Sequence, residues 1–124
     1  MFCNSPRHRY LSLEMQKDGT VRILFDQGTP VPLRKSLSPH EVKTAYEMGW
    51  SDIQNGDLLA AADSSFDVLV TTDKNLRYQQ NLSGRKLAIV VLPFASWPRL
   101  QPLVPLIVEA IEFIDPGGFV ELHP

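Results

Sequence analysis

The sequence predicts an α/β domain built around a mostly parallel central sheet. Three short apolar runs, Val21–Phe25, Phe66–Thr71 and Leu87–Leu92, are typical of strands that are buried on both faces. Segments with helical signals separate these runs, and such alternation is the pattern of α/β domains. The polar loops after the first two runs carry Asp26 and Asp73. Because ligands bind at the carboxyl edge of a parallel sheet, both carboxylates are expected at one potential site.

The segment before the first buried run has no regular pattern. Residues 1–9 are expected to form a loose arm. Leu11–Met15 could form a short strand, and Lys17–Gly19 a turn that leads into Val21–Phe25 as a hairpin. Residues 1–20 are therefore expected to be an N-terminal extension of the domain or a hairpin added to the sheet edge.

Two interpretations compete for the segment that follows the first buried run. Val31–Leu37 is a short helix candidate because two of its leucines stand four residues apart. Ser38–Glu41 has the pattern of a capping box with proline at the first helical position, which favours a helix over 39–48. The alternative is a short strand at Glu41–Ala45 followed by a turn.

Helical signals precede and follow the second buried run. Asn55 is a strong N-cap candidate, Asp57 falls in the first turn, and the leucines and alanines that follow supply an apolar face. A second, short helix is expected over 76–82, with Gly84 as the residue that ends it.

The C-terminal segment predicts a longer helix and a last strand. Apolar residues from Leu103 to Ile114 keep the helical i, i+3/4, i+7 spacing, and prolines are confined to the region before and within the first turn. The sequence Pro116-Gly-Gly ends this helix, and Phe119–Leu122 is expected as an edge strand.

Length and composition set bounds on the class of protein. With 124 residues, 44% hydrophobic and 21% charged, the chain is expected to form one globular domain over 1–124. No apolar run reaches the roughly 18 residues of a membrane span, and the N-terminus lacks a signal-peptide core. Cys3 is the single cysteine and cannot form an internal disulfide, so a cytoplasmic setting is expected. A pI near 5.9 is not that of a duplex-binding module.

Acidic residues are concentrated in the middle of the chain. Seven carboxylates and one base, Lys43, lie between Glu41 and Asp73. A solvated acidic face is one interpretation; the other is that some acids converge on Mg²⁺ or Mn²⁺, which prefer oxygen ligands. Asp26 and Asp73 are the first candidates and Asp57 is the third, although loop capping and a favourable helix dipole are the structural alternatives for them.

Amides and bases near these acids are candidates for substrate binding. A phosphate or base could be bound by Asn55, Asn75, Lys74, Arg77 and Gln80. Arg77, Arg85 and Lys86 could meet nucleic-acid phosphate near Asp73, with a solvated basic face as the alternative. Trp50 could stack on a base, with core packing as the alternative.

Four segments together resemble the PIN-like protein family, in particular the small single-domain members grouped with toxins of toxin–antitoxin pairs. They are ILFDQGTPVPLRKSL, HEVKTAYEMGW, NGDLLAAA and FDVLVTTDKNL. The resemblance implies a three-layer α/β/α fold and a Mg²⁺- or Mn²⁺-dependent ribonuclease site of about four acids. It also favours the strand at Glu41–Ala45 over the helix. The family's acid positions match Asp26 and Asp73.

The remaining acid positions of the family depart from its pattern. They correspond here to Gln27, to Asn55 or, with a displacement, Asp57, and to Asn75. An amide oxygen can ligate a metal but brings no charge.

Three hypotheses follow. The first is a metal-dependent ribonuclease that cuts single-stranded RNA, possibly a toxin with an antitoxin partner, in which Asp26, Asp57 and Asp73 hold the metal. The second is a non-catalytic PIN-like module that binds RNA or a protein. The third, a flavodoxin-like receiver, shares the aspartates at the sheet edge but lacks an acidic pair beside Asp26. Exposed apolar surface on the C-terminal helix would indicate a homodimer.

Overall fold

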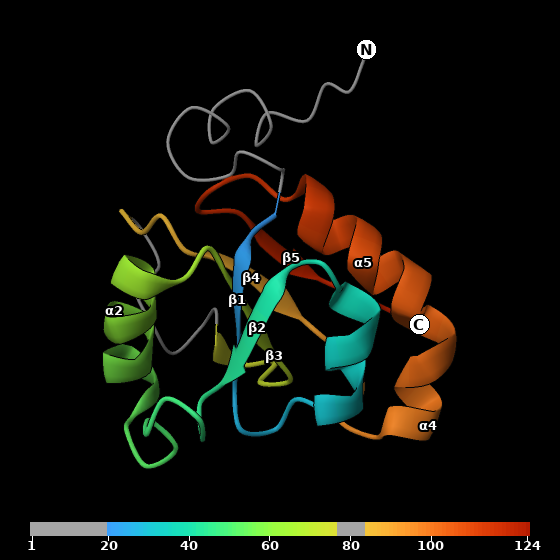
Figure 1. Ribbon diagram of the computed structural model, residues 1–124, viewed down its shortest axis with the longest axis horizontal. Coiled ribbons are helices and arrows are strands. Elements are labelled where there is room, and N and C mark those ends of the chain that lie inside the picture. Colours follow the sequence, from blue (N-terminus) through green and yellow to red (C-terminus); the bar gives the residue numbers. More distant parts are fainter. Residues whose placement is uncertain (1–19, 77–83) are drawn as a thin grey trace.

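The computed structural model describes residues 20–76 and 84–124 and confirms the α/β class. Five parallel strands form one sheet in the order β2-β1-β3-β4-β5 (Figure 1). The elements along the chain are β1 (Arg22–Phe25), the 3-10 helix η1 (Val31–Leu37), β2 (Glu41–Thr44), α2 (Asn55–Ser65), β3 (Val68–Thr71), β4 (Ala88–Val91), α4 (Trp97–Leu100), the 3-10 helix η2 (Gln101–Leu103), α5 (Val104–Phe113) and β5 (Phe119–Glu121).

The three apolar runs form the inner strands of this sheet, as predicted. Leu24 of β1 pairs with Lys43 of β2 on one side and with Leu69 of β3 on the other. Both edges of β1 are therefore occupied by neighbouring strands. The expected strand at Leu11–Met15 lies outside the described residues.

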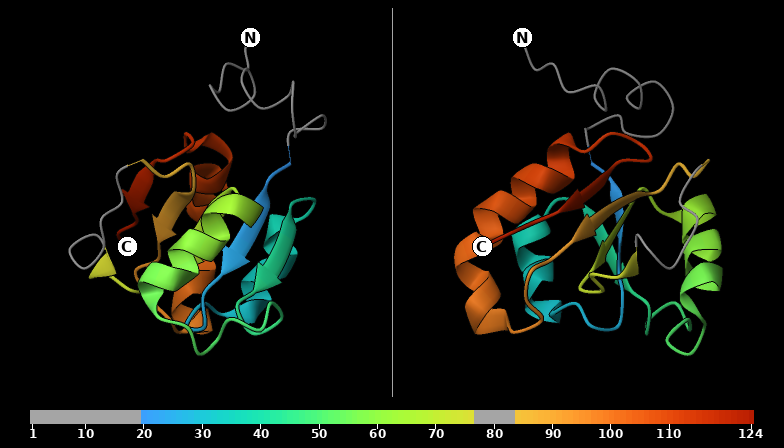
Figure 2. Two further views of the ribbon diagram at one scale, coloured as in Figure 1. Left: turned by 90° about the vertical axis from the view of Figure 1, so that its left-hand side faces the viewer. Right: turned by 180° about the vertical axis from the view of Figure 1, so that it is seen from behind.

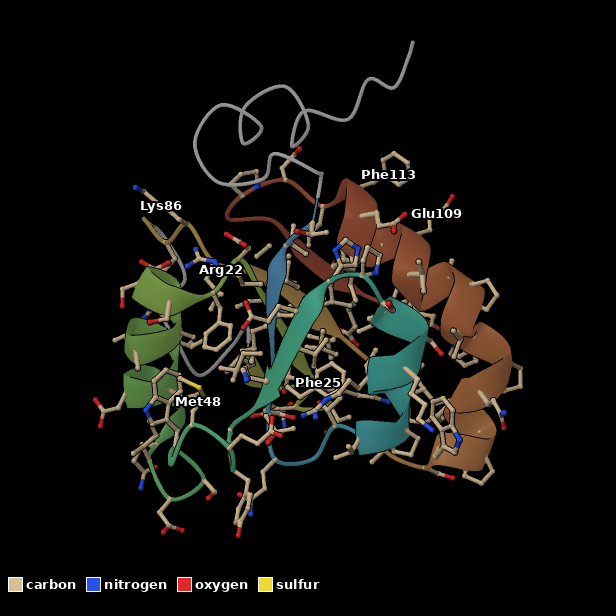
Figure 3. All side chains as sticks on the ribbon, in the orientation of Figure 1. Arg22, Phe25, Met48, Lys86, Glu109 and Phe113 are labelled. Carbon is tan, nitrogen blue, oxygen red and sulfur yellow. The ribbon has the colours of Figure 1, made fainter. Side chains whose placement is uncertain are left out.

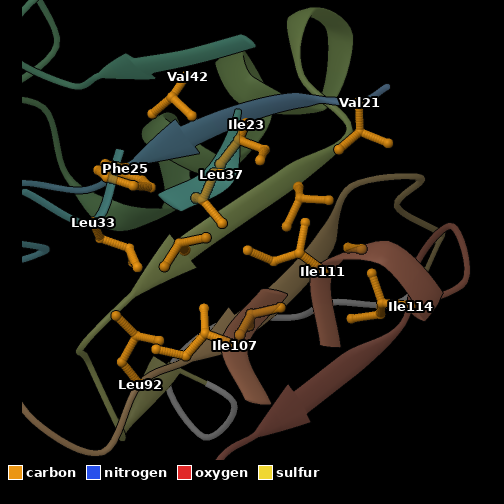
Figure 4. Packing of buried hydrophobic residues seen from close by; sticks show 14 of the residues in the cluster. Val21, Ile23, Phe25, Leu33, Leu37, Val42, Leu92, Ile107, Ile111 and Ile114 are labelled. Atoms are coloured by element: carbon orange, nitrogen blue, oxygen red, sulfur yellow. The ribbon is translucent and has the colours of Figure 1, made fainter. Parts of the chain in front are cut away.

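Helices cover both faces of the sheet. η1, α4 and α5 lie on one face, and α2 lies on the other (Figures 1 and 2). Alternate residues of β1 divide between the two cores: Ile23 and Phe25 pack with the first group of helices, and Leu24 packs with α2. Figure 4 shows the first core, in which Ile107 and Ile111 of α5 point toward the strands. Burial on both faces explains why these strands read as continuous apolar runs.

The capping-box interpretation of Ser38–Glu41 is wrong, because Glu41–Thr44 forms strand β2. The reciprocal box lies three residues later. The Glu47 carboxylate accepts a hydrogen bond from the Thr44 N–H at 2.9 Å, and the Thr44 hydroxyl accepts one from the Glu47 N–H at 3.0 Å. This pair closes a single turn after β2 and leads the chain back across the carboxyl edge.

One further boundary differs from the sequence prediction. Asn55 is the first residue of α2, and Gln54 occupies the N-cap position without a side-chain cap hydrogen bond. The predicted C-terminal helix is confirmed as α5, and α4, η2 and α5 each have a proline in the first turn. Over residues 20–76 and 84–124, no helix is both long and apolar enough to cross a membrane.

Candidate functional site

Asp26 lies at the carboxyl end of β1 and its carboxylate is held by several donors. The Thr71 hydroxyl donates to one carboxylate oxygen, and the Thr29 hydroxyl (2.8 Å) and the Gly28 N–H (3.2 Å) contact the other. The Thr29 hydroxyl is also 2.9 Å from the Val70 carbonyl oxygen, which ties the loop to β3. These contacts fix the orientation of the Asp26 carboxylate.

Gly28 allows the loop after β1 to come close to the loop after β3. A Cβ atom at this position would lie 2.7 Å from the Thr72 hydroxyl oxygen. Only glycine fits this contact without a shift of Thr72, so the residue brings the two loops together.

Asp73 lies at the same edge, as the sequence predicts, and Thr71 connects it to Asp26. The Thr71 hydroxyl accepts a hydrogen bond from the Asp73 N–H at 3.0 Å while it donates to Asp26. Thr71 is 2% exposed, so this connection lies within the protein. The Asp73 carboxylate accepts from the Asn75 N–H at 3.0 Å, an Asx turn that shapes the loop after β3.

A small pocket of about 110 Å³ opens beside Asp26. Its lining includes Asp26, the exposed Gln27 and Trp50; the other lining residues are Gly28, Ala45, Ser51, Ile53 and Leu58. Trp50 is half-buried and meets Phe66 edge-to-face with ring centroids 6.1 Å apart. The ring therefore packs against the α2 core, and the same residue borders the pocket, where it can contact a ligand.

The third predicted ligand, Asp57, is exposed in the first turn of α2. Neither Asp57 nor Asp73 lines the pocket beside Asp26, although Leu58, the neighbour of Asp57, does. In the described parts of the chain, no group of three His, Cys, Asp or Glu side chains is placed to hold a metal ion. The geometry therefore connects the Asp26 carboxylate to the main chain of Asp73 through Thr71, at one edge of the sheet.

Other acids of the middle segment have structural partners. The Asp63 carboxylate accepts from the N–H groups of Lys86 and Leu87, each at 2.8 Å. Asp67 is buried at the amino end of β3, where it binds the main chain and guanidinium of Arg22 (Figure 3). These two carboxylates lie at the opposite edge from Asp26, so the acidic stretch does not converge on one site.

Glu47 has the one resolved pKa shift among the described groups. Its hydrogen bond from the Thr44 N–H and, next, its bond to the Arg34 guanidinium at 2.6 Å lower the pKa of this carboxyl below 4.5. The shift follows from donors that stabilise the charged form.

The predicted substrate-binding residues divide into three groups. Lys74 and Asn75 are exposed in the loop that carries Asp73. Asn55 begins α2. Arg77 and Gln80 lie outside the described residues.

The prediction that Arg85 and Lys86 meet phosphate near Asp73 is wrong. Both residues precede β4, and Lys86 is bound through its N–H to Asp63 and through its carbonyl to the Gly117 N–H. They therefore lie at the amino edge of the sheet, where Figure 3 places Lys86.

Sequence reasoning missed three residues at the carboxyl edge. Thr29 and Thr71 fix Asp26, and Arg99 lies over the Phe94 ring at 3.8 Å in the segment that follows β4. Threonine after a strand is too common to indicate a site, whereas Phe94 and Arg99, separated by five positions, meet only through the path of this segment.

The comparisons with known proteins identify no relative. No family model matches the chain, and searches of curated proteins and of solved structures give no match.

Proposed function

We propose that this protein is a metal-dependent ribonuclease that acts on single-stranded RNA. The observation that carries the proposal is the position of Asp26 and Asp73 at the carboxyl ends of β1 and β3, where the buried Thr71 hydroxyl joins the Asp26 carboxylate to the Asp73 N–H. This edge is where ligands bind in open α/β sheets. The resemblance of the surrounding segments to PIN-like proteins, with their three-layer α/β/α fold, supports the same assignment.

The oxygen atoms at this edge suit Mg²⁺ or Mn²⁺. Magnesium is usually held by one or two carboxylates together with water and substrate phosphate, so Asp26 and Asp73 suffice as protein ligands. When bound, such an ion supplies an activated water and stabilises charge on the phosphoryl group. Asp57 is proposed as a third ligand or a base that orients water, acting from the first turn of α2.

The remaining residues position the RNA. The pocket beside Asp26 offers a Trp50 ring and a Gln27 amide, groups that bind the face and the edge of an unpaired base. Lys74 and Asn75 extend from the Asp73 loop toward solvent and would bind the phosphate backbone, joined by Arg77 and Gln80 of the same segment, while Asn55 would orient a ligand. Single-stranded RNA is the substrate class because its bases are free to enter a pocket of this size.

A second candidate is a non-catalytic PIN-like module that binds RNA or a protein. It is favoured by Gln27, Asn55 and Asn75 at the family's acid positions. Under this alternative, the hydrogen bonds to the Asp26 carboxylate stabilise the loop conformation and have no catalytic role.

The role of a toxin is also part of the proposal, together with an antitoxin partner and action in the cytoplasm. It is supported by the resemblance to small PIN-like toxins. A small protein encoded beside this gene, whose co-expression relieves growth arrest, is the expected finding.

Cleavage of a panel of single-stranded RNAs with Mn²⁺ or Mg²⁺ tests the activity. The wild-type protein is compared with Asp26→Asn, Asp73→Asn and the matched control Asp115→Asn, an exposed acid at the end of α5. We expect metal-dependent cutting that both site variants reduce by at least about 100-fold and the control preserves. Circular dichroism confirms that each variant is folded. Cutting that survives in the site variants, or its absence in the wild type, favours the binding module.

A further inference from the structure

A second hollow in the surface lies away from the carboxyl edge. It has a volume of about 370 Å³, is open to solvent and lies between α5 and β5. Its lining residues are Leu106, Glu109, Ala110, Phe113, Ile114 and Val120, and they define the α5–β5 groove. The largest side chains in it are poorly covered, since Leu106 is 41% and Phe113 is 56% exposed.

The pattern of α5 indicates that this groove is normally covered. Ile107 and Ile111 form the buried face of the helix (Figure 4), whereas Leu106, Ala110 and Phe113 form a second apolar stripe at i, i+4 and i+7. A helix that is apolar on both sides is typical of elements buried on both sides. Figure 3 shows Phe113 and Glu109 projecting from α5 away from the sheet. An apolar stripe of this kind, left open, marks an interaction surface.

The charge around the groove identifies the chemistry of the partner. Of the residues that line the groove, Glu109 is the charged one, and no Lys or Arg is among them. Glu112 of the same helix lies 3.4 Å from the His40 ring instead. Arg85 and Lys86 meet Gly117 through main-chain atoms, and neither lines the groove. We propose that the α5–β5 groove binds a short amphipathic segment of another protein, whose apolar side chains are flanked by Lys or Arg.

The same charges argue against a second copy of this chain as the occupant. A symmetric dimer places one patch against its own copy, so it would bring two Glu109 carboxylates into one apolar interface that has no Lys or Arg lining the groove to pair with them. Like charges across an interface disfavour association, whereas a basic segment complements them. RNA is disfavoured for the same reason. The inference does not depend on the proposed ribonuclease activity.

Fluorescence anisotropy with two labelled peptides tests the proposal on the full-length protein. One is a 14-residue amphipathic helix of leucine and lysine, and the other carries glutamate in place of lysine. We expect saturable binding of the lysine peptide alone. Phe113→Asp should weaken it by about tenfold or more, as for a central interface aromatic, and Glu109→Lys by about fivefold. Tyr46→Asp is the matched control, because Tyr46 is 80% exposed on a different surface.

Three outcomes would overturn the proposal. The first is peptide binding that Phe113→Asp and Tyr46→Asp weaken equally, which indicates that the peptide binds the protein surface outside the groove. The second is a dimer in light scattering that Phe113→Asp converts to monomer, which makes a second copy the occupant. The third is tighter peptide binding by an Arg7→Glu, Arg9→Glu variant, which makes the chain's own N-terminal residues the occupant. Circular dichroism of each variant separates these results from loss of fold.

Discussion

Thr71 is the residue on which the geometry of the candidate site depends most. Its hydroxyl both donates to Asp26 and accepts from the Asp73 N–H, and it is almost completely buried. Replacement by valine keeps the shape of the side chain but removes both hydrogen bonds, which leaves polar groups without partners. We expect Thr71→Val to lower the free energy of unfolding by about 1–3 kcal/mol, measured by urea denaturation.

Thr72→Val provides the matched control for this experiment. Thr72 is the next residue, is half-exposed and also has a β-branched side chain, so its replacement should change stability by no more than about 0.5 kcal/mol. Thr71→Ser, which retains the hydroxyl, should recover most of the loss and, in the cleavage assay, most of the activity. Equal effects of Thr71→Val and Thr72→Val would show that the network contributes nothing specific.

The sequence predicts the two aspartates of the site but not how they are fixed. Asp26 and Asp73 follow apolar runs that could be identified as buried strands, and parallel strands place such residues at one edge. Asp57 follows a helical signal instead, and the position of a helix start relative to a sheet depends on loop conformation that local pattern does not determine. The bond from Thr71 to Asp26 joins positions 45 residues apart, so it could not be predicted from local spacing.

The segment around β2 shows how local signals compete at the scale of an element. Ser38–Glu41 and Thr44–Glu47 both have the capping-box pattern, and only the second forms the reciprocal hydrogen bonds. The first is overridden because Ile23 and Val42 pair across two neighbouring strands, with a side chain buried at each position. Packing of Val42 against the first core thus favours a strand at this position, and the capping box forms in the next turn, between Thr44 and Glu47.

The turn after β2 is expected to depend on pH through Glu47. Its pKa is lowered below 4.5 in the folded protein by the Thr44 N–H and the Arg34 guanidinium, so the charged carboxylate stabilises the fold. A lowered folded pKa means that this contribution is complete above the unfolded pKa and is lost as pH falls through the folded pKa. Glu47→Gln should therefore destabilise the protein at pH 7, and the difference from wild type should shrink below about pH 4.5.

Urea unfolding at a series of pH values measures this difference directly. Glu121→Gln serves as the control, since Glu121 lies in the edge strand β5 on the far side of the sheet. Its difference from wild type should not follow the same profile. A Glu47→Gln difference that stays constant from pH 7 to pH 3 would contradict the assignment of the effect to the ionised carboxylate.

At the scale of the whole molecule, the two cores share one sheet and should unfold together. The chain has two tryptophans, and they report on opposite faces: Trp50 packs against the α2 core and Trp97 against the core of η1 and α5. β3 is buried on both faces and belongs to both cores. Variants Trp50→Phe and Trp97→Phe, each with a single remaining tryptophan, should therefore give equilibrium unfolding curves that agree with circular dichroism of the same variant.

A core substitution on one face gives the stronger form of this prediction. Leu59→Ala acts on the α2 core and Ile107→Ala on the opposite core, and both side chains are 0% exposed. Each should lower the free energy of unfolding by about 2–5 kcal/mol, through lost apolar contacts and a residual cavity. If the two cores unfold cooperatively, each substitution shifts the unfolding transition reported by either tryptophan by the same amount. A shift confined to the tryptophan on the altered face would mean that the two layers of helices unfold independently of each other.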